Sequence, residues 1–178
     1  KELVMKKIYL TLVAMLISFN AHAFIISPHV GLDYVSATPN GFGDIDSLNG
    51  GAVSAGVKVL GFLSVEGYYQ QYASTDAFGG SKTKPAAYGI DLVSDTLNLG
   101  VVELLTTVGY GKYTLDGGNL NKKMEDFEGT AYRAGFGAQF NPTDNIGIRA
   151  MYRYVFPEDD TFKKNIQEFA VGIRYYFF

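Results

Sequence analysis

Ten charged residues of this 178-residue chain occupy alternate positions within segments whose neighbouring positions are mostly apolar or aromatic. Successive side chains of a β-strand point to opposite faces, so this spacing places all ten charges on one face of a predicted sheet. They are Asp33, Lys58, Glu66, Asp91, Glu103, Arg133, Arg149, Arg153, Glu168 and Arg174. Such a face can form a salt-bridged core or line a charge-selective channel. The equal number of acidic and basic residues favours the paired core.

Acid–base or nucleophilic catalysis has few candidates in this sequence. After residue 23 the chain holds one histidine, His29, which lies on the same predicted face as Asp33. We interpret His29 as an interior hydrogen-bonding group rather than a catalyst. The absence of cysteine excludes a thiol nucleophile and a Cys-based zinc site. Asp44 and Asp46 lack the acid that a calcium loop needs eleven residues after Asp44, so no metal or cofactor is predicted.

The elements that must position the charges are strands, because the period-two alternation recurs along the whole chain and no helical period appears. No segment after residue 23 is apolar over a length that would form a transmembrane helix. The alternating runs cover residues 26–36, 52–60, 63–70, 87–93, 99–115, 130–140, 146–156 and 169–177. Glycine and aromatic residues are abundant, as in strand-rich chains with many turns.

The connections between these runs alternate in length. Short turns near Gly61 and at residues 94–98 and 141–145 separate four long polar segments, at residues 37–50, 73–85, 116–128 and 157–165. Alternating short and long connections place all the long segments at one rim of an up-and-down barrel. The sequence therefore predicts an all-β fold, an eight-stranded antiparallel transmembrane β-barrel. A soluble lipocalin-like barrel is disfavoured because its apolar face would point inward.

The last strand carries the clearest lipid-facing stripe. Its apolar face consists of Phe169, Val171, Ile173, Tyr175 and Phe177, whereas its other face includes Arg174. With Phe177 outward, Phe178 is one residue beyond the stripe, and Arg174 shares the enclosed face with Glu168. An apolar outer band and a polar interior are typical of outer-membrane barrels.

The first 23 residues have the pattern of a secretory signal peptide. Met5 is followed by two lysines, an apolar run over residues 8–19 and the cleavage pattern of residues 21–23. We predict cleavage after Ala23, which leaves a barrel domain over residues 24–178 with 12 basic and 17 acidic residues and a net charge of −5. So acidic a chain is a poor candidate for nucleic-acid binding.

Three segments resemble strands of the OmpX/Ail group of small outer-membrane barrels, which are akin to the OmpA transmembrane domain. They are residues 108–113, residues 134–142 and the last strand, residues 169–177. The resemblance implies a monomeric barrel without an open pore, inserted by the outer-membrane assembly machinery that reads the C-terminal strand. It also implies extracellular loops that act in adhesion, host colonisation or resistance to host defences.

Lysines near the predicted loop rim are expected to face lipopolysaccharide, whose phosphates accept charge-assisted hydrogen bonds. They are Lys112, Lys122, Lys123, Lys163 and Lys164. The predicted function is that of a surface protein in the outer membrane, whose loops contact host molecules. A small porin or channel is the first alternative, and an enzyme that modifies lipid A or the envelope is the second.

Overall fold

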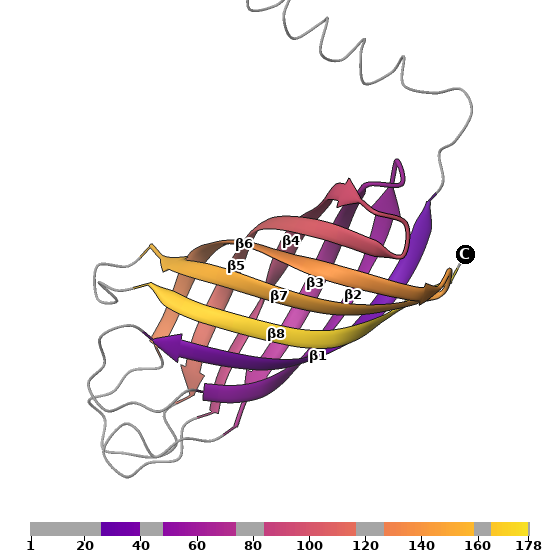
Figure 1. Ribbon diagram of the computed structural model, residues 1–178. Coiled ribbons are helices and arrows are strands. Elements are labelled where there is room, and N and C mark those ends of the chain that lie inside the picture. The colour runs from indigo at the N-terminus through magenta and orange to yellow at the C-terminus, as the bar shows by residue number, and fades with distance from the viewer. Residues whose placement is uncertain (1–25, 40–47, 74–83, 117–126, 159–164, 178) are drawn as a thin grey trace, which may run out of the picture.

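The computed structural model describes residues 26–39, 48–73, 84–116, 127–158 and 165–177, and it confirms the predicted fold class. Eight strands form one closed antiparallel barrel in which each strand pairs with its neighbours in sequence (Figure 1). They are β1 (Ser27–Pro39), β2 (Leu48–Val59), β3 (Leu63–Tyr72), β4 (Lys84–Asn98), β5 (Val102–Asp116), β6 (Phe127–Thr143), β7 (Ile146–Pro157) and β8 (Ile166–Tyr176). Among these described residues, no helix has the length and hydropathy needed to cross a membrane.

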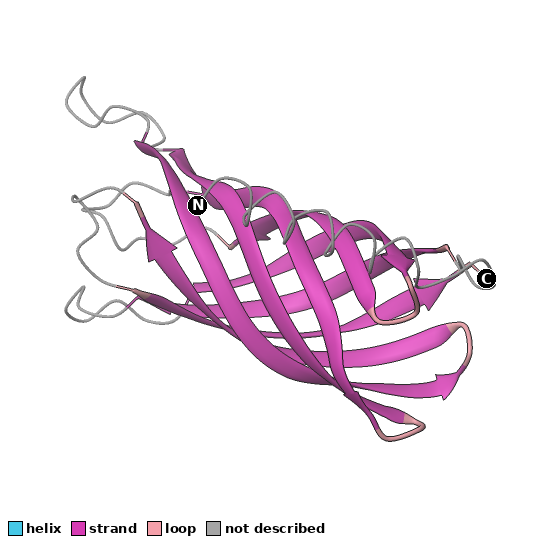
Figure 2. Cartoon of the chain, turned by 90° about the horizontal axis from the view of Figure 1, so that it is seen from above, coloured by secondary structure: helices cyan, strands magenta, loops and turns pink. Residues whose placement is uncertain are grey.

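The barrel closes between its first and last strands. The β1–β8 register runs from His29 opposite Tyr176 to Pro39 opposite Ile166, and the backbone N–H of Phe177 donates to the carbonyl of Pro28. The three short turns and the C-terminus lie at the same end of the barrel (Figure 2). We call this end the turn end and the opposite one the loop end.

The faces of the strands follow the predicted alternation. Large hydrophobic residues cover the outside, and the stripe of the last strand is among them: Phe169, Val171, Ile173, Tyr175 and Phe177 are 39–57% exposed. An exposed apolar surface of this extent is suited to lipid. Inside, polar and charged side chains are buried, together with a small apolar cluster that includes Val35, Met151 and Ala170.

Local chemistry explains the short turns. Leu60 and Gly61 both adopt a positive φ, at 56° and 70°, so the chain reverses between β2 and β3 within three residues. Between β4 and β5, the side-chain oxygen of Asn98 accepts a hydrogen bond of 2.8 Å from the backbone N–H of Gly100, whose φ is also positive. An Asn side chain that binds the backbone two residues later favours a turn.

Several predicted boundaries are wrong because the strands are longer than the apolar runs. Residues 94–98 belong to β4, and its connection to β5 is residues 99–101. Residues 141–143 belong to β6, so that only Asp144 and Asn145 form the turn; a register shift beside Pro142 accommodates its missing N–H. The predicted loops 37–50 and 116–128 likewise lose residues to the strands at both ends, 73–85 loses residues 84 and 85 to β4, and 157–165 loses residue 157 to β7. Pairing continues into these polar residues because ladder hydrogen bonds do not require apolar side chains.

Candidate functional site

The ten charges predicted to share one face all lie inside the barrel, where each forms an ion pair. Near the turn end, Lys58 lies between two carboxylates, with Nζ 2.5 Å from Asp95 Oδ2 and 3.5 Å from Glu103 Oε1. Glu103 also accepts longer hydrogen bonds from the side-chain amides of Asn98 and Gln139. This group closes the turn end of the interior with polar contacts.

The next ion pair crosses the barrel from β7 to β3. The guanidinium of Arg149 donates two hydrogen bonds, of 2.8 and 2.7 Å, to the carboxylate of Glu66. His29 Nε2 lies 3.1 Å from Glu66 Oε1, so the histidine is held inside the barrel against a carboxylate. Its ring also packs against that of Tyr176, with centroids 5.1 Å apart. This is the hydrogen-bonding position that the sequence suggests for His29.

The middle of the barrel contains two more arginine–carboxylate pairs. Arg174 binds Asp33 through hydrogen bonds of 2.9 and 2.8 Å, across the seam between β8 and β1. Arg133 binds both oxygens of Asp91, and its guanidinium carbon lies 3.4 Å from the ring centroid of Tyr68. Bidentate geometry and a stacked ring fix the orientation of these guanidinium groups.

Toward the loop end, Glu168 is fully buried and has four partners. Arg153 donates a hydrogen bond of 2.8 Å and Arg133 Nη1 lies 3.8 Å away, while Gln70 and Tyr72 donate bonds of 2.8 and 3.2 Å. Two positive charges and two neutral donors compensate for the burial of this carboxylate. The interior is therefore occupied along its length by paired side chains.

Sequence reasoning missed Asp95, because residues 94–98 were predicted to form a turn. Asp95 continues the alternation of Asp91 and Val93 on β4 and reaches Lys58. The alternating run of residues 87–93, continued by two residues, places Asp95 on the inner face. With Asp95, six acidic and five basic residues of the described interior are paired, instead of the equal numbers that were predicted.

The predicted rim lysines are placed only in part. Lys112 lies on β5, opposite Tyr88 on one side and Thr130 on the other, and is partly exposed. Lys122, Lys123, Lys163 and Lys164 lie outside the described residues. Nearby at the loop end, Thr130 and Tyr110 donate hydrogen bonds to the exposed carboxylate of Glu158. The Thr130 hydroxyl, with those of Tyr110 and Tyr132, lowers the pKa of Glu158.

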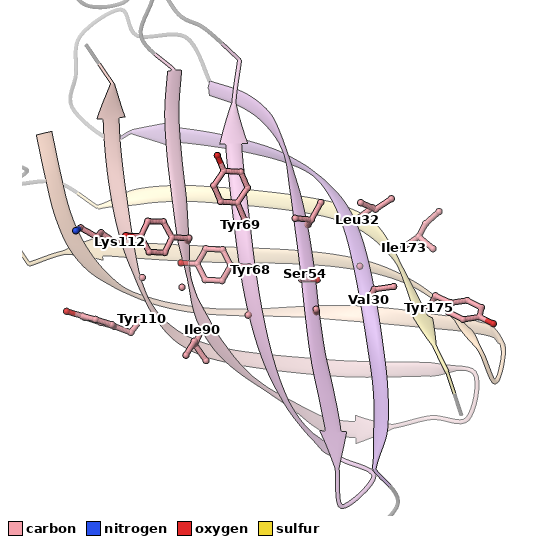
Figure 3. Close-up of a pocket in the computed structure, with 17 residues that line it drawn as sticks. Val30, Leu32, Ser54, Tyr68, Tyr69, Ile90, Tyr110, Lys112, Ile173 and Tyr175 are labelled. Carbon is pink, nitrogen blue, oxygen red and sulfur yellow. The ribbon is translucent and has the colours of Figure 1, made fainter. Parts of the chain in front are cut away.

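No group of three His, Cys, Asp or Glu residues in the described part of the chain could hold a metal ion. A hollow with a volume of about 1220 Å³ lies in the outer surface of the described barrel. It extends across the strands from Tyr175 and Ile173 on β8 to Tyr110 and Lys112 on β5 (Figure 3). We call it the outer groove. A second hollow of about 830 Å³ adjoins it and shares the lining residues Leu32, Val53, Tyr69 and Ile173.

Comparison with solved structures finds barrels of the same kind at low sequence identity. The N-terminal β-barrel domain of Pseudomonas aeruginosa OprF has a TM-score of 0.60 at 14% identity, over 84% of this chain and 97% of that one. Neisserial surface protein A gives 0.56 at 19% identity, over 84% and 96% of the two chains. Ail, the attachment invasion locus protein of Yersinia pestis, gives 0.53 at 19% identity, over 85% and 97%. These similarities show the fold.

No curated protein matches this chain. The family model described as the outer membrane protein β-barrel domain matches residues 10–177, almost the whole sequence. That match agrees with the closed eight-stranded barrel, its apolar outer surface and its charged interior. The chain belongs to the outer membrane protein β-barrel domain family.

Proposed function

We propose that this protein is a bacterial surface protein that acts through its extracellular loops in adhesion, host colonisation or resistance to host defences. The observation that carries the proposal is the paired interior, from Lys58 near the turn end to Glu168 near the loop end. A barrel filled in this way offers no open passage, so the segments beyond the strands are left to contact other molecules. The shared fold with Ail, a protein named for attachment and invasion, supports this choice.

The proposal also states how the protein reaches the outer membrane and which end of the barrel faces the periplasm. The signal peptide is removed after Ala23, and the assembly machinery recognises the stripe from Phe169 to Phe177 and inserts a monomer into the outer membrane. The turn end faces the periplasm, and the four segments at the loop end face the outside. We assign a structural role to His29, because it is buried and its Nε2 contacts the Glu66 carboxylate. A histidine held in this way is not available for catalysis, which favours a binding protein over an enzyme.

The adhesion proposal is tested by shortening the segments at the loop end one at a time. Residues 40–47, 74–83, 117–126 and 159–164 are each replaced by a short Gly-Ser connection, and bacteria that express each variant are tested for binding to host cells. We expect at least one variant to bind no better than bacteria that lack the protein. Each variant must retain heat-modifiable mobility on a denaturing gel, the sign of a folded barrel. Full binding by all four variants would overturn the proposal.

The paired interior also predicts the electrical behaviour of the protein. In planar bilayers the purified barrel is expected to show no stable open events, because the Glu66–Arg149 ion pair and the hydrogen bonds from Gln70 and Tyr72 to Glu168 cross the lumen. The conductance of single insertions is the measurement. A matched recording from the Glu168→Gln variant tests whether loss of one charge opens the interior. Stable open events in the unmodified protein would favour the small-channel alternative.

A further inference from the structure

A layer of apolar side chains crosses the lumen between two groups of charged residues. Its members belong to one hydrophobic cluster and are 0–3% exposed: Val35 on β1, Val93 on β4, Leu105 on β5, Met151 on β7 and Ala170 on β8. Partly buried Ala52 on β2 packs against the same cluster. We call these residues the apolar layer. Side chains as buried as these have almost no contact with water, although they lie inside a polar lumen.

The strand register makes the layer continuous over half of the barrel wall. Ala170 lies opposite Val35 on one side and opposite Met151 on the other. Met151 lies opposite Gly137, which in turn lies opposite Leu105. A Cβ atom at Gly137 would overlap Met151 Sδ, so glycine at this position lets the methionine side chain lie against β6. Because the strands of such barrels are tilted, the layer crosses the lumen obliquely.

Along individual strands the layer separates charges near the turn end from charges near the loop end. On β4 it falls between Asp95, on the turn-end side, and Asp91. On β7 it falls between Arg149, on the turn-end side, and Arg153. Each strand therefore contributes to both groups of charges and interrupts them with one apolar residue.

The ion pairs follow the same division. On the turn-end side, the pairs are Lys58 with Asp95 and Glu103, Arg149 with Glu66, and Arg174 with Asp33. On the loop-end side, they are Arg133 with Asp91 and Glu168, and Arg153 with Glu168. Within the described part of the barrel, no ion pair joins one group to the other. The charges thus form two separate networks.

We propose that the apolar layer, and not the ion pairs, is the permeability barrier that keeps water and ions from crossing the barrel. A narrow apolar section excludes water, whereas charged and polar walls hold it. Each network has a buried guanidinium Nε without a hydrogen-bond partner among the described residues, on Arg149 and on Arg153. Water on either side of the layer would satisfy these groups. This role is independent of the loops, so a protein that failed in the adhesion assay would still be sealed.

The rate of proton leak into lipid vesicles tests the barrier. The full mature barrel is reconstituted into vesicles that enclose a pH-sensitive dye, and the external pH is stepped. Vesicles with the unmodified protein are expected to leak no faster than vesicles without protein. The double variant Leu105→Ser and Met151→Ser is expected to raise the leak rate by at least about tenfold, because its hydroxyl groups offer hydrogen bonds to entering water.

The matched control is the double variant Leu105→Ala and Met151→Ala, which removes a similar volume without adding hydroxyl groups. Apolar cavities stay dry, so its leak rate should equal that of the unmodified protein. Glu168→Gln, which leaves the layer intact, should also remain tight. Equal leaks from the serine and alanine variants, a tight serine variant, or a leak through Glu168→Gln would each overturn the proposal. Heat-modifiable mobility verifies that each variant is folded.

A second measurement uses variants that leave the apolar layer unchanged. The shifts of the urea midpoint caused by Glu66→Gln and Glu168→Gln are expected to add in the double variant, because the two carboxylates belong to separate networks. The shifts caused by Asp91→Asn and Glu168→Gln should not add, because both carboxylates contact Arg133. Equal departures from additivity in the two pairs would show that charges are coupled through the layer, which would overturn the division on which the barrier depends.

Discussion

Replacing Arg149 with leucine is expected to lower the free energy of unfolding by about 3 kcal/mol. Arg149 is 2% exposed and donates two hydrogen bonds to Glu66, which is itself buried. Removing the guanidinium leaves the buried Glu66 carboxylate with only its contact to His29 Nε2 among these partners. A buried charge that has lost its partner is among the costliest defects that a single substitution introduces. Urea unfolding in lipid vesicles, followed by heat-modifiable mobility, measures the change.

The control for this prediction removes both charges. In the double variant Glu66→Leu and Arg149→Leu no carboxylate is stranded, and leucine fills part of the vacated volume. Replacing a buried ion pair by apolar residues is often close to neutral, so the double variant should be more stable than Arg149→Leu alone. An unchanged urea midpoint in Arg149→Leu would contradict the importance of this pair. A double variant less stable than the single one would show that the two side chains act independently.

The sequence predicts the face of each charged residue but not its partner. Alternation alone places Glu66 and Arg149 on the inner side, because a strand offers only two faces. Their pairing depends on the shear of the closed barrel, which brings β3 and β7 into contact across the lumen although the residues are 83 positions apart. Arg174 and Asp33, separated by 141 positions, lie on neighbouring strands only because β8 closes on β1. Such pairs become visible only after the register of all eight strands is known.

The ends of the strands and the outer groove escaped prediction for another reason. Apolar alternation marks the part of a strand that lies in lipid, whereas backbone pairing continues beyond it, so Asp95 was assigned to a turn. The groove depends on which small residues become neighbours across strands. Ala55 and Gly67 are each unremarkable in sequence, and their hollow arises because the β2–β3 register sets them side by side.

Replacing Gly172 with alanine is expected to destabilise the barrel by about 2 to 3 kcal/mol. Gly172 faces inward on β8, between Arg149 of β7 and Asp33 of β1. A methyl group here would overlap Asp33 Oδ1 and the carbonyl oxygen of Leu32, and would lie 2.8 Å from Asp33 Cα. The backbone contacts cannot be relieved by a rotamer change, so the seam between β1 and β8 must widen. The movement also displaces Asp33 from Arg174. The urea midpoint measures the cost.

The matched control is Gly67→Ala, because Gly67 lies on the opposite, outer face of the sheet with ordinary contact distances around an added methyl group. Its stability should remain within about 0.5 kcal/mol of the unmodified protein. Both substitutions reduce the backbone freedom of the unfolded chain in the same way, so their difference isolates the steric effect at the seam. Equal urea midpoints for the two variants would mean that the closure of β8 on β1 tolerates a methyl group. A lower midpoint for Gly172→Ala alone would identify the inner glycine as a requirement for closing the barrel around Asp33.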